Sequence, residues 1–111
     1  TMGSVKFEEQ QISVQTDDPD VVAPLLIEKI TLVCQDEATI AMVGLHKDHF
    51  AAMILKLHQG RTRTELSDPL VKNSILEQIK QQANNLLGRL SPEMELKVLE
   101  ALHVKFMIVD L

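Results

Sequence analysis

Aromatic residues are scarce in this sequence: its 111 residues include three Phe, no Tyr and no Trp. A core built without aromatic rings has to be aliphatic, from Leu, Ile, Val and Met. Proteins that hold single-stranded nucleic acids stack the bases on aromatic side chains, and this shortage argues against that class. The formal net charge of −5 argues in the same direction, because an acidic chain repels a phosphate backbone. We therefore predict no nucleic acid among the partners.

Cysteine is also scarce, since Cys34 is the single one. It cannot form a disulfide within the chain, which favours a reducing cytoplasmic location. No apolar run approaches the roughly 18 residues of a membrane span, so we expect no membrane association. Residues 1–4, TMGS, resemble a tag remnant around a start codon. The remaining residues, 5–111, have the length and composition of a single globular domain.

The first half of the sequence predicts strands and one helix. Residues 5–15, VKFEEQQISVQ, alternate as a strand does, with a phase slip that a β-bulge would explain. Residues 16–20, TDDPD, predict a turn and the start of a helix that continues to about residue 30. Residues 30–45 favour a β-hairpin with DEA as its turn. The alternative is that the helix continues through Gln35 and that a second helix begins at Asp36.

The second half has clearer helical patterns. Apolar residues at positions i, i+3, i+4 and i+7 from Phe50 predict a helix over residues 46–59 that Gly60 ends. Residues 60–67 read as a polar loop. Asp68 and Pro69 begin a helix that runs to about Leu90, and residues 91–93, SPE, begin another. Residues 103–111, HVKFMIVDL, predict a closing strand with two apolar faces, either inside the sheet or at a contact between chains.

These elements together predict an α+β domain. The terminal strands, with the possible 30–45 hairpin, form a small antiparallel sheet that packs against three or four helices.

The histidines do not predict a metal site. His46 and His49 lie three residues apart on a helix and could share an ion. The sequence supplies no third ligand on that face, because His58 falls on the opposite side of the helix and His103 on another element. We predict no metal and no cofactor.

The polar side of the helix over residues 68–90 is the most informative surface. At about 100° per residue, one stripe carries Glu77, Gln81, Asn84 and Gly88, with Asn85 beside it. Asn is a poor helix former, and Gly costs about 1 kcal/mol relative to Ala. A solvated helix face would explain these residues. The alternative is a flat, neutral surface against which a partner protein lies.

The segment from Gln81 to Gly88, QQANNLLG, also carries a resemblance. Together with the order hairpin, helix, loop and helix over residues 30–92, it is similar to the CheC/CheX family of chemotaxis phosphatases. That family has an E-x-x-N-x-x-x-G helix. The resemblance implies hydrolysis of an aspartyl phosphate on a response regulator, with the water oriented by Asn84. Gln81 stands where the family has Glu, so an ion pair with the regulator's lysine is lost.

Two functional hypotheses follow. The first is a non-enzymatic cytoplasmic module for protein interaction or regulation that forms a homo-oligomer. It depends on the apolar terminal strand and on the lack of convergent catalytic residues. The alternative is a phosphatase related to CheC/CheX, with Asn84 and Gln81 as its catalytic residues.

Overall fold

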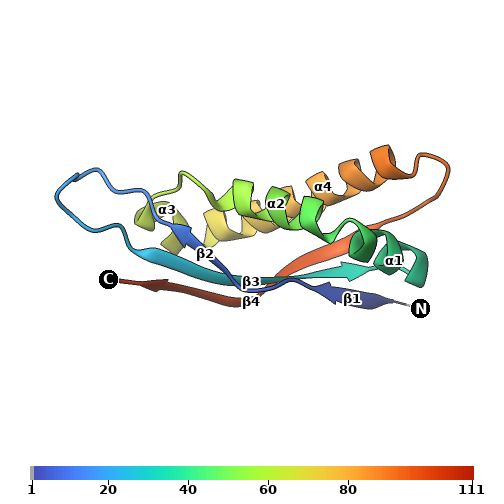
Figure 1. The fold of residues 1–111 in the computed structure, drawn as a ribbon, viewed down its shortest axis with the longest axis horizontal. Coiled ribbons are helices and arrows are strands. Elements are labelled where there is room, and N and C mark those ends of the chain that lie inside the picture. The colour runs from blue at the N-terminus through green and yellow to red at the C-terminus, as the bar shows by residue number, and fades with distance from the viewer. Residues whose placement is uncertain (1) are drawn as a thin grey trace.

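The fold is a single antiparallel sheet with all of its helices on one face, as Figure 1 shows for a computed structural model. The structure describes residues 2–111. This arrangement confirms the predicted α+β class. The molecule is elongated, with extents of 51 × 23 × 22 Å, because the two longest strands run side by side along its length. No helix within residues 2–111 has the length and apolarity to cross a membrane.

The sheet is built around one central strand. Its strands are β1 (Gly3–Lys6), β2 (Gln10–Ser13), β3 (Leu25–Cys34) and β4 (Val98–Val109). β4 pairs with β3 along the whole length of β3, whereas β1 and β2 pair with its two ends. Because β4 occupies one edge of β3, the two short strands share the other edge.

The predicted strand over residues 5–15 is two strands rather than one bulged strand. Val5 and Ile12 are both buried under the helices. They are seven residues apart, and side chains alternate faces along a strand, so one continuous strand cannot bury both. The break at residues 7–9 resolves this conflict. At the break, the Phe7 N–H donates to the carbonyl of Ile30 at 3.0 Å.

The helix predicted up to residue 30 is wrong, and so is the hairpin over residues 30–45. Residues 25–34 form β3, whose buried residues recur with the period of a strand. The chain then turns into α1 (Glu37–Leu45). The Asp36 carboxylate caps this helix by accepting a hydrogen bond from the Thr39 N–H at 2.9 Å. The alternative of a helix beginning at Asp36 is therefore correct for this half of the segment.

The two longer helices confirm their predicted bounds closely. α2 (Lys47–His58) buries Phe50 and Ile54, and Gly60 follows it with a φ of 74°. α4 (Pro69–Leu90) is capped by Asp68, and its fully buried residues are Ile75, Ile79, Ala83 and Leu87. The polar loop predicted between them contains a short helix, α3 (Arg63–Ser67). A capping box between Thr62 and Glu65 stabilises the start of α3, and Leu66 is the buried residue of this helix.

The helix predicted from residue 91 is wrong, because β4 begins at Val98, five residues before the predicted strand. Residues 91–97 are a connection from α4 back to the sheet, with a turn closed by the Met94 N–H and the Ser91 carbonyl at 3.2 Å. β4 is also an edge strand and does not lie inside the sheet, since β3 is the one described strand that pairs with it.

Candidate functional site

The polar stripe of α4 divides into free and engaged residues. Glu77, Gln81, Asn85 and Gly88 are exposed. Asn84 is half-buried and turns toward β4. Its amide nitrogen donates to the carbonyl of Val98 at 3.0 Å, and its oxygen accepts from the N–H of Val98 at 2.7 Å. Asn84 therefore joins α4 to the first residue of β4, and in this structure both of its amide atoms form hydrogen bonds with that residue.

β4 presents a long outer edge. Within residues 2–111 no strand pairs with that edge. Three of its side chains are large, apolar and exposed: Leu102 at 40%, Val104 at 64% and Met107 at 46%. Unpaired edges with apolar residues are sites at which another strand adds to a sheet.

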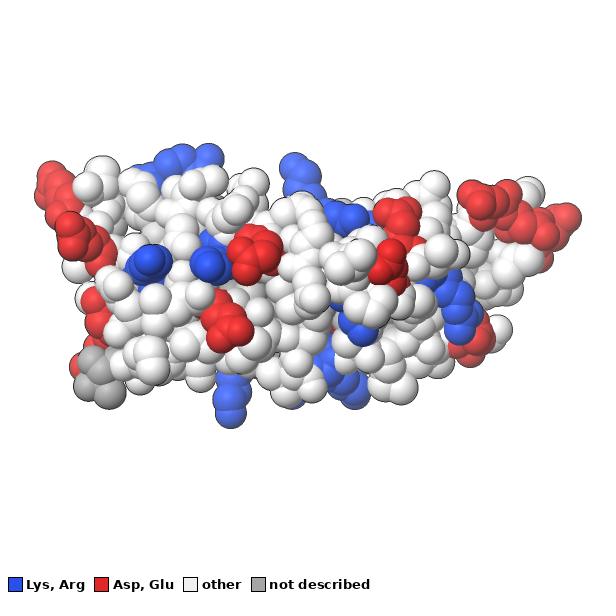
Figure 2. Space-filling model, turned by 180° about the vertical axis from the view of Figure 1, so that it is seen from behind, with Lys and Arg blue, Asp and Glu red and all other residues white. Residues whose placement is uncertain are grey.

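The sheet face opposite the helices carries apolar and basic residues together. Cross-strand partners in an antiparallel pair share a face, so Met107 lies beside Ile27, and Lys105 beside Lys29. No helix covers this face (Figure 1). Figure 2 shows one long side of the molecule, on which basic and acidic residues alternate along the middle and acidic residues gather at both ends. That side carries no extended basic patch among the described residues.

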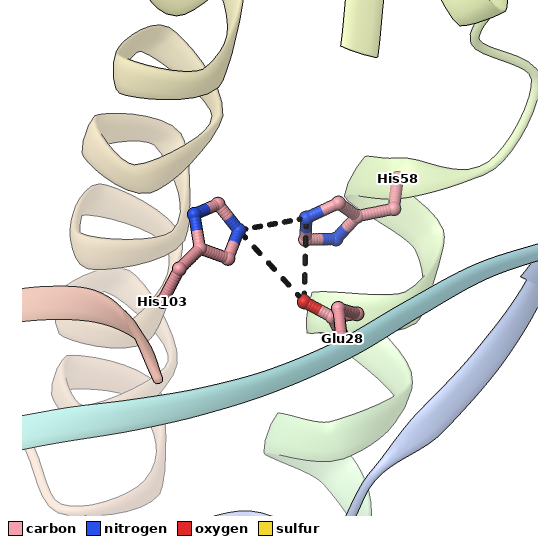
Figure 3. Close-up of side chains that lie close together, drawn as sticks. All are labelled: Glu28, His58 and His103. Atoms are coloured by element: carbon pink, nitrogen blue, oxygen red, sulfur yellow. Dashed lines mark hydrogen bonds and ion pairs between the residues drawn. The ribbon is translucent and has the colours of Figure 1, made fainter. Parts of the chain in front are cut away.

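The helix-covered side of the sheet contains a cluster of three ionisable residues, Glu28, His58 and His103 (Figure 3). Glu28 comes from the middle of β3, His58 from the last residue of α2, and His103 from β4. The His58 Nε2 atom lies 3.4 Å from both Glu28 Oε2 and His103 Nε2. The third separation, from His103 Nε2 to Glu28 Oε2, is 3.9 Å.

Burial controls the protonation of this cluster. The Glu28 and His58 side chains are 1% and 0% exposed, and that of His103 is 11% exposed. Burial raises the pKa of the Glu28 carboxyl to about 7. Burial also lowers the pKa of His58. The pKa of His103 falls to about 4 through burial and through the nearby His58 and Lys72. Both imidazoles are therefore neutral near pH 7, and their contacts with Glu28 are not ion pairs.

A β-bulge aims His103 into this cluster. Lys105 pairs with Lys29 and His103 pairs with Ile30, which leaves Val104 without a partner on β3. Lys105 and His103 are two residues apart and would share a face in a regular strand. The extra residue reverses the alternation, so that His103 faces the helices beside Ile30 while Lys105 faces the open side.

Sequence reasoning missed all three residues of the cluster. Glu28 fell within a predicted helix, where one charged residue indicates nothing. Read as a strand, LLIEKITLVC places Glu28 in phase with the buried Leu26 and Ile30. A charged residue at a core position was therefore the available signal. The approach of His58 and His103 depends on tertiary structure and on the bulge, neither of which the sequence pattern reveals.

The remaining candidates do not form sites of this kind. The rings of His46 and His49 stack in parallel with centroids 6.1 Å apart. Within residues 2–111, no third ligating residue joins them in a cluster. Cys34 is buried. Burial and the Asp36 carboxylate raise the pKa of its thiol to about 11, which disfavours the reactive thiolate.

Comparison with known proteins adds no relatives. No protein-family model matches this chain, and no curated protein matches it. The resemblance to CheC/CheX phosphatases therefore stays a prediction.

Proposed function

We propose that this protein is an interaction module that forms a homodimer by antiparallel pairing of two β4 edges. One observation carries the proposal: β4 is a 12-residue edge strand with exposed apolar side chains and no described strand on its outer side. Extending the sheet across a two-fold axis would give hydrogen-bond partners to the outward N–H and C=O groups of β4 in both copies at once.

The bulge restricts where this pairing can occur. After Val104, residues 105–109 pair regularly with β3 and contain no further register shift. This stretch pairs with its own copy over its full length when the two-fold axis passes through its middle residue, Met107. Phe106 then lies opposite Ile108 of the second copy, and Lys105 lies opposite Val109 of the second copy.

The chemistry of these pairs suits self-association. Phe106 and Ile108 are on the helix-covered side, where their partners on β3 are Glu28 and Leu26. In this pairing, Met107 lies opposite Met107 of the second copy on the open face of the sheet. No like charges lie opposite each other. An axis through Lys105 would bring two ammonium groups together, which destabilises a strand pair.

The test compares the mass in solution of the wild type and of two variants by sedimentation or light scattering over a concentration series. Met107→Lys introduces two ammonium groups at the proposed axis and should convert a dimer into a monomer. Leu45→Lys is the matched control. Leu45 is 76% exposed on α1, which contacts β1 at the edge of β3 opposite to β4, so this variant should remain a dimer.

Two results would overturn the proposal. One is a wild type that stays monomeric at the highest concentration measured. The other is a Met107→Lys variant that dimerises as strongly as the wild type, because the interface would then lie elsewhere. Circular dichroism of each variant verifies that the fold is retained.

A further inference from the structure

We propose that Glu28, His58 and His103 form a binding site for a divalent transition-metal ion of the zinc class. The ion would bind between the Nε2 atoms of the two imidazoles and the Oε2 atom of the carboxylate. This site is independent of the proposed dimer, since all three residues come from one chain and face the helices rather than the outer edge of β4.

The distances within the cluster fit a shared ion better than direct hydrogen bonds. Two ligand atoms of a tetrahedral zinc ion, each about 2.0–2.1 Å from the metal, lie about 3.3–3.4 Å apart. Two of the three separations are 3.4 Å and the third is 3.9 Å. Hydrogen bonds between nitrogen and oxygen have lengths of about 2.7–3.2 Å, and all three separations exceed this range.

The tautomer of His58 places a free electron pair in the cluster. The His58 Nδ1–H donates to the carbonyl of Ile54 at 2.9 Å. A carbonyl can only accept, so a neutral His58 carries its proton on Nδ1 and leaves Nε2 with a free electron pair. A backbone carbonyl that accepts from the other ring nitrogen in this way is one of the common outer-shell partners of a metal-binding histidine.

Glu28 provides an independent indication. Its Oε2 atom is buried and has no hydrogen-bond donor among the described residues. A buried carboxylate without a donor is costly, and a bound cation would remove that cost. The residue lies on β3, the central strand of the sheet, so its position is fixed from both sides.

The ligand set determines the class of ion. Two imidazole nitrogens and one carboxylate oxygen suit zinc and its neighbours, whereas magnesium and calcium prefer oxygen ligands throughout. Three protein ligands leave a fourth tetrahedral position for water or another small ligand. His103, the most exposed of the three side chains, marks the side from which the ion would enter.

The first experiment measures metal binding to the full chain after chelation and removal of any polyhistidine tag. Titration with Zn²⁺ should show one ion per chain and should raise the melting temperature. Titration with Co²⁺ should produce the intense visible absorption bands of a tetrahedral cobalt ion with nitrogen and oxygen ligands.

Three variants locate the ion. Glu28→Gln and His103→Gln replace ligands by uncharged residues of similar size, and each should weaken binding of Zn²⁺ by more than about 100-fold. His49→Gln is the matched control, because it removes one histidine of the surface pair His46 and His49. This control should bind Zn²⁺ as the wild type does.

Either of two results rules out the site. In one, Zn²⁺ and Co²⁺ do not bind to the wild type at micromolar concentrations. In the other, His49→Gln abolishes binding while His103→Gln preserves it, which assigns the ion to the surface pair. X-ray absorption at the zinc edge of the wild type needs no variant and should show two imidazoles. A spectrum with one imidazole or with a sulfur ligand contradicts the proposal even if a variant fails to fold.

Discussion

Asn84 shows how much of this fold depends on one side chain. Its amide bonds to both backbone groups of Val98, at the point where the chain re-enters the sheet after seven residues of irregular connection. The connection places β4 on β3, and β4 contributes both His103 and the outer edge. An asparagine in the middle of a helix, which intrinsic propensity disfavours, is therefore explained by a contact outside the helix.

We predict that Asn84→Ala lowers the free energy of unfolding by about 1–3 kcal/mol, because it leaves a donor and an acceptor of Val98 without partners. Urea unfolding followed by circular dichroism measures the change. Asn85→Ala is the control, since Asn85 is exposed and its replacement should change stability by less than about 0.5 kcal/mol. Equal stabilities of the two variants would show that the contacts with Val98 contribute little.

The same pair of variants bears on the resemblance to CheC/CheX phosphatases. If phosphate release from a phosphorylated response regulator depends on Asn84, the activity must be compared at a temperature where Asn84→Ala is fully folded. A loss of activity that follows the loss of folded protein reflects the structural contact alone.

At the scale of elements, the junction between β3 and α1 depends on an acidic cap. The Asp36 carboxylate accepts hydrogen bonds from the N–H of Thr39 at 2.9 Å and from its hydroxyl at 2.6 Å. These hydrogen bonds with Thr39 lower the pKa of Asp36, because they favour the ionised form. The cap ends the strand and starts the helix within two residues, which is why a hairpin prediction fails there.

We predict that Asp36→Ala destabilises the protein at neutral pH and that this difference becomes smaller in acid. Folding lowers the pKa of the Asp36 carboxyl. Its contribution to the free energy of unfolding is therefore complete above the unfolded pKa of about 3.9. The contribution is lost as the pH falls through the lower pKa of the folded state. Urea unfolding of both proteins at pH values from 7 down to about 3 measures the difference. A difference that is independent of pH in this range would contradict the role of the charge.

Elements with strong local signals could be predicted from the sequence, and the others could not. α4 has a capping aspartate, a first-turn proline and four turns of apolar spacing, so its bounds follow from local interactions. β3 has apolar residues on both faces, and over residues 21–30 such a run satisfies a helical period equally well. Only its pairing with β1, β2 and β4 decides in favour of a strand. Pro92 indicates a helix start, but the chain must instead return to the sheet.

At the scale of the whole molecule, the dependence on tertiary structure limits what the sequence could predict about the candidate sites. Glu28, His58 and His103 are 30 and 45 residues apart along the sequence, and three different elements bring them together. Their meeting requires the strand identity of β3, the end of α2 and the bulge at Val104. The apolar character of the terminal strand, in contrast, is a local property and was visible in HVKFMIVDL. Its place at the edge of the sheet was not.

Because β4 is an edge strand, we predict a pattern of hydrogen exchange at its backbone N–H groups. This pattern distinguishes pairing through the β4 edge from association through the open face of the sheet. In an antiparallel ladder, alternate residues point their N–H groups toward one neighbour or the other. Among residues 105–109, the N–H groups directed toward β3 should exchange slowly in every state. Those directed outward should exchange slowly in the wild type at concentrations where it is dimeric, and rapidly in Met107→Lys.

Hydrogen exchange followed by NMR resolves these two sets of amides. Dilution of the wild type supplies an internal control, because a dimer held by β4 must lose protection of the outward set as it dissociates while the inward set is unchanged. If outward amides stay rapid in a wild-type dimer of confirmed mass that Met107→Lys nevertheless dissociates, the two copies contact each other through the uncovered sheet face around Ile27 and Met107. The backbone of β4 would then remain free to accept a strand from a different protein.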